Sequence, residues 1–484
     1  MRETLASTHR LDHQQRHEAY WQSRKKKFFL AIAIFFILLQ LLFLGNMSYL
    51  YGSVWKSTSR YNAFKVLYVD YDEGVIGRAV NQAYEQLRGP GFPTLIQRDK
   101  GLYPSMEDVI GAVKDTSYWA AFVTNPNASD RIAQALQGGQ MAQGYNASGA
   151  LSYVWNEVRY SPFSDEIFEA NFEALSIATR LAYNMLNGTA ALQLLNKEDP
   201  EALQVLLNPV MASSVNLMPT MQQTKLFYNT ATMVMPILQQ FFFLLILNGV
   251  SQNLQIYSKL PLYISGIVRG GLSVIFDSFA ALCMSGYIWA FRENWDVNGN
   301  QFVLTWMLLW LLMHIHFLII DACTAVLPLP GLPFFLLTWI IINITSSISP
   351  FEANPGFYRW GYSLPTNEAY TVLTDIWSFG NVPQLYRALP VLFAWWIAGI
   401  CLATYGHFYR CHKAWKQDEK LDRLAQTELK GSGQGTPGDS SLQPLRMTPS
   451  ETLLEAAEIY RSAYGPSVPL PVGLWRPFGV PDTS

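Results

Sequence analysis

The stretch FFLAIAIFFILLQLLFLGNMSYL, residues 28–50, decides the architecture of this 484-residue chain. It is almost wholly apolar, and a helix needs about 20 such residues to cross the hydrocarbon core of a membrane. Five further apolar stretches follow, near 230–250, 270–290, 302–320, 331–348 and 388–406. We therefore predict an α-helical polytopic membrane protein with six spans, arranged as one plus five. The 331–348 stretch is short and has Pro333 near its start, so a re-entrant helix is its alternative.

Local charge orients these spans. The basic cluster Arg24–Lys27 directly precedes the first span, and such clusters stay on the cytoplasmic side. Segment 51–228 would then lie outside or in a lumen. Six crossings return the chain to the cytoplasm, in agreement with Arg410, Lys413 and Lys416 after the last span. A cleaved signal peptide is the alternative for the first span. It is disfavoured because the run is too long and no A-x-A-like site follows.

The predicted outer segment carries three N-glycosylation sequons, at Asn127, Asn146 and Asn187. Their position predicts a glycoprotein of a secretory-pathway membrane, and the sequons alone allow the endoplasmic reticulum or any other compartment of that pathway. All four cysteines of the chain lie outside this segment, so it must fold without disulfides. No metal-ligand spacing is present among those cysteines, and no metal is expected.

Alternation of strands and helices predicts a small extracytoplasmic α/β domain between the first and second spans. The run FKVLYV at 64–69 is typical of a buried parallel strand. Predicted strands are 64–69, 94–97, 118–124 and 151–160, and predicted helices are 76–87, 106–113, 129–136 and 165–186. Segment 208–219 is expected to lead the chain back to the membrane. Asp70, Asp72 and Glu73 follow the first strand, and they indicate either turn and helix-cap chemistry or a cation or partner contact.

Five regions follow from this plan. They are a cytoplasmic tail at 1–27, the first span at 28–50, the extracytoplasmic α/β domain at 51–228, a five-span membrane domain at 229–408 and a largely disordered cytoplasmic tail at 409–484. The last region includes the flexible linker GSGQGTPG at 431–438.

Sequence motifs argue against catalysis. The glycine-rich linker has no Lys-Ser/Thr, so it is not a Walker motif, and neither G-x-S-x-G nor H-E-x-x-H occurs. We predict that the chain is not an enzyme and needs no cofactor. The net charge of −2 also argues against a nucleic-acid partner.

Four ionisable residues fall in or next to predicted spans: Asp277, His314 and His316 lie within them, and Asp321 lies near the inner end of the fourth. Such groups are costly in hydrocarbon and usually face the interior of a bundle or water. Our hypothesis is that Asp277 and His314 line a polar path or pair across helices. His314 and Asp321 are seven residues apart, which places them on one helix face. The alternatives are satisfied structural pairs, or positions nearer the membrane surface.

The order of parts resembles that of type-two ABC exporter permeases and of bacterial phage-infection (Pip-like) proteins. The segments VDYDEGVIGRAV (69–80) and WAAFVTNPNASDRIAQALQGG (119–139), and the pair Asn208-Pro209, carry that resemblance. YRWGYSLP (358–365) is similar to the last outer loop of the fungal nitrosoguanidine-resistance (Sng-type) membrane proteins. These resemblances imply export-like activity, drug or mutagen resistance, location in the plasma membrane and a role in its lipid asymmetry, but no catalytic residue. A permease of this type works with a separate ATPase, for which loop 251–269 is the candidate contact.

The predicted function is therefore that of a transporter-like protein that exports, or confers resistance to, toxic or mutagenic amphipathic compounds. The alternative is a non-transporting regulator or scaffold that affects lipid asymmetry or another pump. Candidate partners are membrane lipids, a small amphipathic substrate, a separate ATPase and a second copy of the chain in a homodimer.

Overall fold

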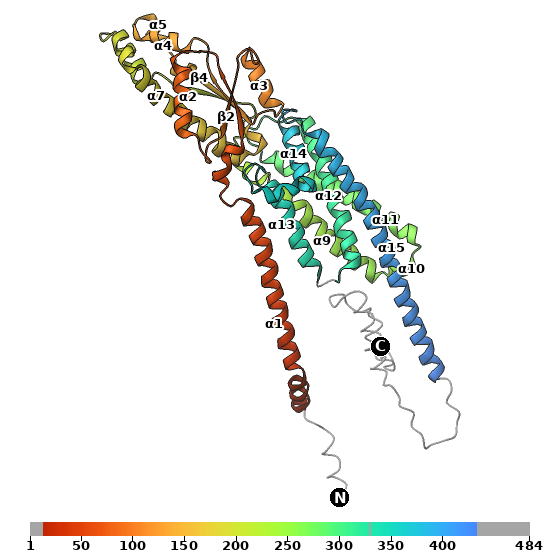
Figure 1. Cartoon of the computed structure of the whole chain (residues 1–484). Coiled ribbons are helices and arrows are strands. Elements are labelled where there is room, and N and C mark those ends of the chain that lie inside the picture. The colour runs from red at the N-terminus through yellow and green to blue at the C-terminus, as the bar shows by residue number, and fades with distance from the viewer. Residues whose placement is uncertain (1–12, 329–330, 433–484) are drawn as a thin grey trace, which may run out of the picture. The chain divides into compact units, whose positions relative to one another are not determined.

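The computed structural model describes residues 13–328 and 331–432 (Figure 1). The predicted linker at 431–438 lies almost wholly outside the described residues, as does the predicted C-terminal tail beyond residue 432. Residues 409–432 of that predicted tail are instead helical, because helix α15 continues to Ser432. The chain divides into two compact units between Gly52 and Ser53.

The described part of the first unit is helix α1, His13–Ser53, without its last residue. Its portion Arg24–Ser53 is long and apolar enough to cross a membrane, and none of its most apolar window is buried within the protein. Phe36 and Leu44 are examples of its exposed apolar side chains. A helix that is apolar on all sides suits a lipid environment. The helix also begins well before the predicted span, so it includes the basic cluster Arg24–Lys27.

The second unit contains a five-stranded sheet in the order β2-β1-β3-β4-β5. Its strands are β1 Lys65–Asp70, β2 Thr94–Arg98, β3 Ala120–Thr124, β4 Leu151–Trp155 and β5 Ala212–Asn216. All neighbouring pairs are parallel except β3 and β4, which are antiparallel. The predicted strand 151–160 is thus shorter than expected, and β5 lies in segment 208–219, where no strand was predicted.

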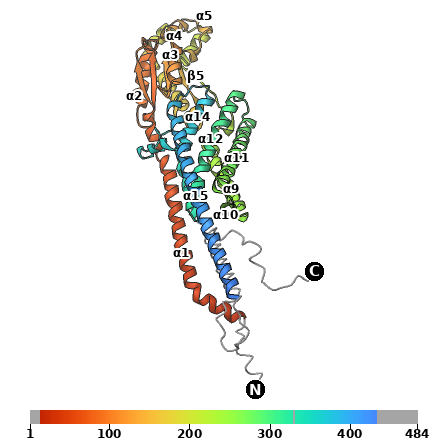
Figure 2. The ribbon, with the colours of Figure 1, turned by 90° about the vertical axis from the view of Figure 1, so that its right-hand side faces the viewer.

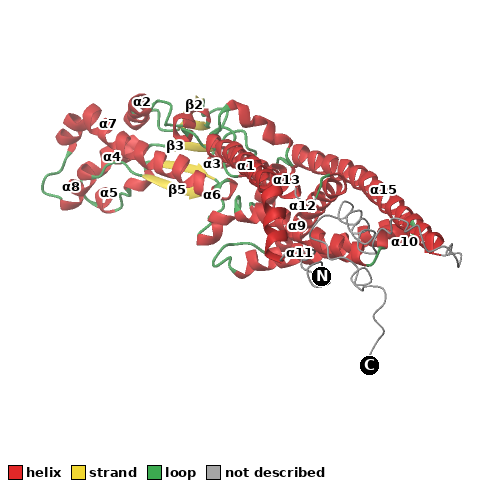
Figure 3. Cartoon of the chain, turned by 90° about the horizontal axis from the view of Figure 1, so that it is seen from below, coloured by secondary structure: helices red, strands yellow, loops and turns green. Residues whose placement is uncertain are grey.

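Helices cover both faces of this sheet. Val66 and Tyr68 of β1 belong to a core shared with α2, α4 and α7, whereas Leu67 and Val69 belong to a second core shared with α3. Successive side chains of a strand point to opposite faces, so a strand covered on both sides is apolar throughout. The helices of this part are α2 Val75–Leu87, α3 Met106–Lys114, α4 Ala128–Leu136, α5 Gln140–Gln143, α6 Ser161–Ser164, α7 Ala170–Leu194 and α8 Pro200–Leu207 (Figure 3).

The remainder of the second unit is helical. Its helices are α9 Ala231–Asn253, α10 Ile256–Lys259, α11 Leu262–Ala290, α12 Gly299–Val326, α13 Leu332–Ser347, α14 Pro365–Trp377 and α15 Leu385–Ser432 (Figures 1 and 2). The short helical segments η1 Ser57–Ala63, η2 Ala147–Gly149, η3 Glu157–Arg159, η5 Gln223–Phe227 and η7 Gly356–Ser363 are 3₁₀ helices, and η4 Asp165–Glu169 is a π-helix.

With α1, five of the described helices are long and apolar enough to cross a membrane: α1, α9, α11, α12 and α15. Helix α13 is apolar but only 16 residues long. Helix α12 contacts α9, α11, α14 and α15, and 61% of its most apolar window is buried, against 28% or less for the other four. It is therefore the central helix. Small residues let α15 approach it, because a Cβ atom at Gly399 would lie only 2.9 Å from Leu318 Cβ.

Candidate functional site

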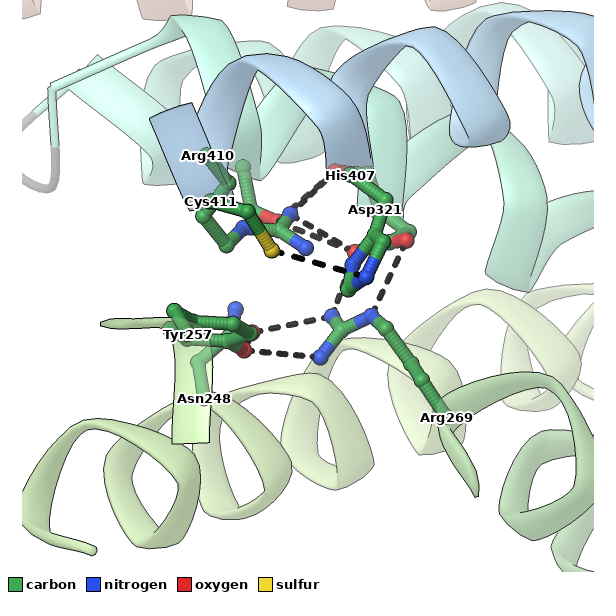
Figure 4. Close-up of polar contacts among 8 residues, drawn as sticks. Asn248, Tyr257, Arg269, Asp321, His407, Arg410 and Cys411 are labelled. Carbon is green, nitrogen blue, oxygen red and sulfur yellow. Dashed lines mark hydrogen bonds and ion pairs between the residues drawn. The ribbon is translucent and has the colours of Figure 1, made fainter. Parts of the chain in front are cut away.

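Three charged side chains from three helices meet inside the helical part (Figure 4). Arg269 of α11 donates from Nε to Asp321 Oδ2 of α12 at 3.1 Å, and from Nη2 to Asp321 Oδ1. Arg410 of α15 donates from Nη2 to the same Oδ1 at 2.8 Å. These side chains, the ion cluster, are 6%, 3% and 11% exposed. Two guanidinium groups against one carboxylate leave a surplus of one positive charge in a poorly solvated place.

Polar side chains of α9 and α10 hold the ion cluster. Arg269 donates from Nη1 to Tyr257 Oη and from Nη2 to Asn248 Oδ1, both at 2.9 Å (Figure 4). Tyr257 Oη in turn donates to Asn248 Oδ1 at 3.0 Å. Buried charges need such hydrogen bonds to offset lost hydration. Among the described residues, however, Nη1 of Arg410 is buried and has no partner.

A second group adjoins the ion cluster. His407 Nε2 lies 2.9 Å from Ser265 Oγ and 3.5 Å from Cys411 Sγ. His407 and Cys411 are one helical turn apart on α15, and Ser265 is on α11, so this group joins the same two helices as the ion cluster. Figure 4 shows His407 and Cys411 beside Arg410.

Asp277 and His314, which were predicted to line a path or to pair, lie side by side. His314 Nδ1 of α12 is 2.9 Å from Asp277 Oδ2 of α11. Asp277 is fully buried, whereas the His314 side chain is 13% exposed. In the described part of the chain, Asp277 Oδ1 has no hydrogen bond of regular geometry, although the side-chain amide of Gln240 lies close enough to interact with the Asp277 carboxylate. Polar capacity is therefore left over beside this pair.

His316 lies apart from that pair. Its Nδ1 accepts a hydrogen bond from Trp339 Nε1 at 3.2 Å, and its Nε2 is 3.4 Å from Thr366 Oγ1. Thr366 donates to Asn343 Oδ1 at 2.9 Å. His316, whose side chain is fully buried, thus joins α12 to α13 and α14 through hydrogen bonds.

Two large cavities meet at His314. One of about 950 Å³ lies among α11, α12 and α15, with Arg269, Asp321 and His407 in its wall. The other, of about 860 Å³, lies among α11, α12, α14 and α15. His314 and Val274 line both. Most other wall residues are apolar, and the volumes are those of sites for small organic ligands. The shared face predicted for His314 and Asp321 corresponds to the wall of the first cavity.

Sequence reasoning missed Arg269, Arg410 and His407. Arg269 was taken as the end of a loop, 251–269, but α11 begins at Leu262 and the residues without regular structure are few. Arg410 was taken as a charge beyond the last span, but α15 continues well past it. The sequence did contain one signal for this cluster. Asp321 lies near the inner end of one apolar stretch, and two other apolar stretches have an arginine, Arg269 or Arg410, near their inner ends.

The predicted sites in the sheet-bearing part lie separately from these groups. Asn127 and Asn146 are exposed, whereas Asn187 lies in α7 and donates to Tyr183 Oη at 3.1 Å. Asp70 Oδ1 accepts from the backbone N–H groups of Asp72 and Glu73, both at 3.1 Å.

These contacts are those of the turn-and-cap alternative for the acidic residues after β1. Asp72 also accepts a hydrogen bond from the backbone N–H of Ser129 at 2.8 Å, near the start of α4. Within residues 13–328 and 331–432, no group of three histidine, cysteine or acidic side chains is placed to hold a metal ion.

The apolar helices, the small mixed sheet and the charged groups buried in the bundle define a mostly helical, membrane-embedded protein. The model of a family described as proteins of unknown function, DUF3533, matches residues 35–401, and the chain belongs to that family. No solved structure matches the chain. The resemblance to nitrosoguanidine-resistance proteins and exporter permeases stays a prediction.

Proposed function

We propose that this protein is a transporter that exports toxic amphipathic compounds along a path between α11, α12 and α15. The observation that carries the proposal is the meeting of two large, mostly apolar cavities at His314. Apolar walls with a few polar groups suit a molecule that has an apolar body and a polar end. His314, held by Asp277 at 2.9 Å, is the polar group that such a molecule would meet in either cavity.

The proposed arrangement in the membrane has six crossings, by α1, α9, α11, α12, α13 and α15. Both ends of the chain would be cytoplasmic, and the sheet-bearing part would lie outside the plasma membrane. Helix α13 is about 24 Å long at about 1.5 Å per residue, short of a hydrocarbon core of about 30 Å. It would therefore cross only where the bilayer is thinned, or would enter and return. The exposed side chains of Asn127 and Asn146 make these two the better glycosylation candidates.

A regulator or scaffold is the second candidate function. The chain contains no Walker motif, so export would need an ion gradient or a separate ATPase. The surplus positive charge of the ion cluster, in the wall of an apolar cavity, would equally suit a held lipid that the protein does not move.

Reconstitution tests the proposal. The purified full chain in liposomes should accelerate movement of an amphipathic fluorescent dye under an imposed ion gradient, compared with protein-free liposomes. His314→Leu should slow this movement markedly at equal protein content, because it removes the polar group common to both cavities. His412→Leu is the matched control, since His412 is exposed on α15 and lines neither cavity. Absence of dye movement under every gradient, with a pump co-purifying, would instead favour the regulator.

A further inference from the structure

A third cavity, of about 410 Å³, lies where the sheet-bearing part meets α14 and the first turn of α15. We call it the Arg159 pocket. Its polar wall residues include Lys65, Arg159, Glu352, Asn367, Gln384 and Arg387. The two parts are hydrogen-bonded here, because Gln384 Nε2 donates to Thr116 Oγ1 at 3.0 Å. In contrast to the two cavities that meet at His314, this pocket has walls rich in polar atoms.

Arg159 is the unusual member of the wall. Its guanidinium carbon lies 3.4 Å from the centre of the Trp119 ring, so the group stacks on an aromatic face. No residue in 13–328 or 331–432 forms a hydrogen bond or ion pair with this guanidinium, and Glu352, whose charge acts on it, is beyond ion-pair distance. Burial lowers the pKa of Arg159 to about 10, which leaves it charged at neutral pH. A partly buried guanidinium with five free donors is ready for an acceptor.

The other charges around the pocket favour an anion. Arg387 donates from Nε to Glu368 Oε2 at 3.2 Å and lies over the Tyr362 ring at 4.7 Å, so the carboxylate of Glu368 largely neutralises its charge. Lys65 is exposed at the start of β1. Three cations, Lys65, Arg159 and Arg387, stand against two acids, Glu352 and Glu368. One positive charge is therefore in surplus, and one anionic group would balance it.

The size of the pocket indicates more than a single ion. A water molecule occupies about 30 Å³ of the liquid, so about 410 Å³ holds an oxyanion together with a covalently attached organic portion. The aromatic rings of Trp119, Tyr362 and Tyr370 offer surfaces on which such a portion can pack.

We propose that the Arg159 pocket binds a monoanionic oxyanion group, a carboxylate or a phosphodiester, carried by an amphipathic molecule. The planar fork of Arg159 donates two parallel hydrogen bonds to two of its oxygens, with Trp119 fixing the plane of the fork. This site does not depend on export, because it lies apart from the cavities that meet at His314.

Binding to the purified full chain in dodecyl maltoside micelles, which contain neither a carboxylate nor a phosphodiester, tests this proposal. Calorimetric titration would use octanoate as the carboxylate, dihexanoyl phosphatidylglycerol as the phosphodiester, acetate as a free ion and octanol as an uncharged control. We expect binding of at least one of the two amphipathic anions and much weaker binding of octanol. The arm that binds more tightly identifies which of the two groups the site prefers, and acetate shows whether the free ion suffices.

Variants then locate the site. Arg159→Gln should weaken binding by about tenfold or more, the loss expected for hydrogen bonds to a charged group. Arg159→Lys should restore part of the affinity, because it keeps the charge without the fork. Arg78→Gln is the matched control, since Arg78 is an exposed arginine on α2, and it should bind as the unchanged protein does. If Arg159→Gln fails to fold, the Arg159→Lys variant decides. If neither amphipathic anion bound more tightly than octanol, or if affinity were unaltered in both Arg159 variants, the proposal would be overturned.

Discussion

Asp321→Asn should destabilise the helical part more than any other single change in the ion cluster. Asp321 is the acceptor for both Arg269 and Arg410, and its side chain is 3% exposed. The substitution keeps the shape of the side chain but leaves two guanidinium groups buried without an anion. Removal of one partner from a buried ion pair costs about 3–5 kcal/mol, because the remaining charge stays uncompensated.

The size of the thermal effect follows from the length of the chain. An unfolding entropy of about 2.1 cal/mol/K per residue, over 484 residues, amounts to about 1 kcal/mol/K. The melting temperature of Asp321→Asn should therefore fall by about 3–5 °C. Arg410→Gln should cost less, because the neutral pair of Arg269 and Asp321 remains. Combining it with Asp321→Asn should recover part of the lost stability.

Thermal unfolding of the purified full chain in nanodiscs, followed by circular dichroism, measures these differences. Glu419→Gln is the control, because Glu419 pairs with Arg423 at 2.6 Å on an exposed turn of α15, where an ion pair is worth about 1 kcal/mol or less. If Asp321→Asn melted no lower than Arg410→Gln, or if the double variant showed no recovery, the carboxylate would not be what holds the two arginines in the bundle.

Three further predictions concern two glycines and a partly buried acid. Gly77→Ala should destabilise the protein by about 1–3 kcal/mol and lower the melting temperature, because the new Cβ would lie 1.9 Å from Asp70 Oδ2. Gly111→Ala is the control: it lies in open space on α3 and should raise the melting temperature slightly. Gly399→Leu should weaken the packing of α15 on α12 and destabilise the protein by a similar amount. Gly286→Leu is the control, since no atom lies within 4 Å of the position of its Cβ, and equal melting temperatures of the two variants would contradict the prediction. Burial raises the pKa of the Asp70 carboxyl, so the fold favours its protonated form and stability falls as the pH rises from about 4 through that raised pKa. Asp70→Asn should remove this slope in melting temperatures measured from about pH 4 to pH 7, and an unchanged slope would show that other groups cause it.

Local pattern was enough for much of the sheet-bearing part. The run at 64–69 became β1, Lys65–Asp70, and the helical spacing at 76–87 became α2, Val75–Leu87. The spacing of apolar residues identifies such elements, because the side chains on the buried face of a helix or strand must be apolar. Within the bundle, Asp277 and His314 were recognisable because an ionisable side chain stands out in an apolar stretch.

Features that depend on distant partners were not predictable. Strand β5, with the sequence ASSVN, has little strand propensity, and it pairs with β4 through contacts such as Trp155 Nε1 to Ser214 Oγ at 3.0 Å. The predicted strand 151–160 stops at Trp155 because the chain then turns, and Glu157 accepts a hydrogen bond from Lys225 at 2.5 Å. Those partners lie about 60 to 70 residues away along the chain, beyond the reach of any local pattern.

The arginines of the ion cluster escaped prediction for a related reason. Charge near the end of an apolar stretch was read as the edge of the membrane, so Arg269 and Arg410 were placed outside the helices. Only the three-dimensional arrangement shows that Asp321 lies between the two arginines, where its carboxylate offsets the cost of burying their charges.

Helix α15 connects two of the charged sites through one continuous helix. Arg387, in its first turn, lines the Arg159 pocket, and Arg410, further along the same helix, belongs to the ion cluster. At about 1.5 Å per residue, roughly 35 Å of helix separates them. A helix resists stretching along its axis. A movement of α15 that shifted Arg387 relative to Glu368 would therefore also shift Arg410 relative to Asp321. Occupancy of one site and the state of the other would then be mechanically linked through a single element.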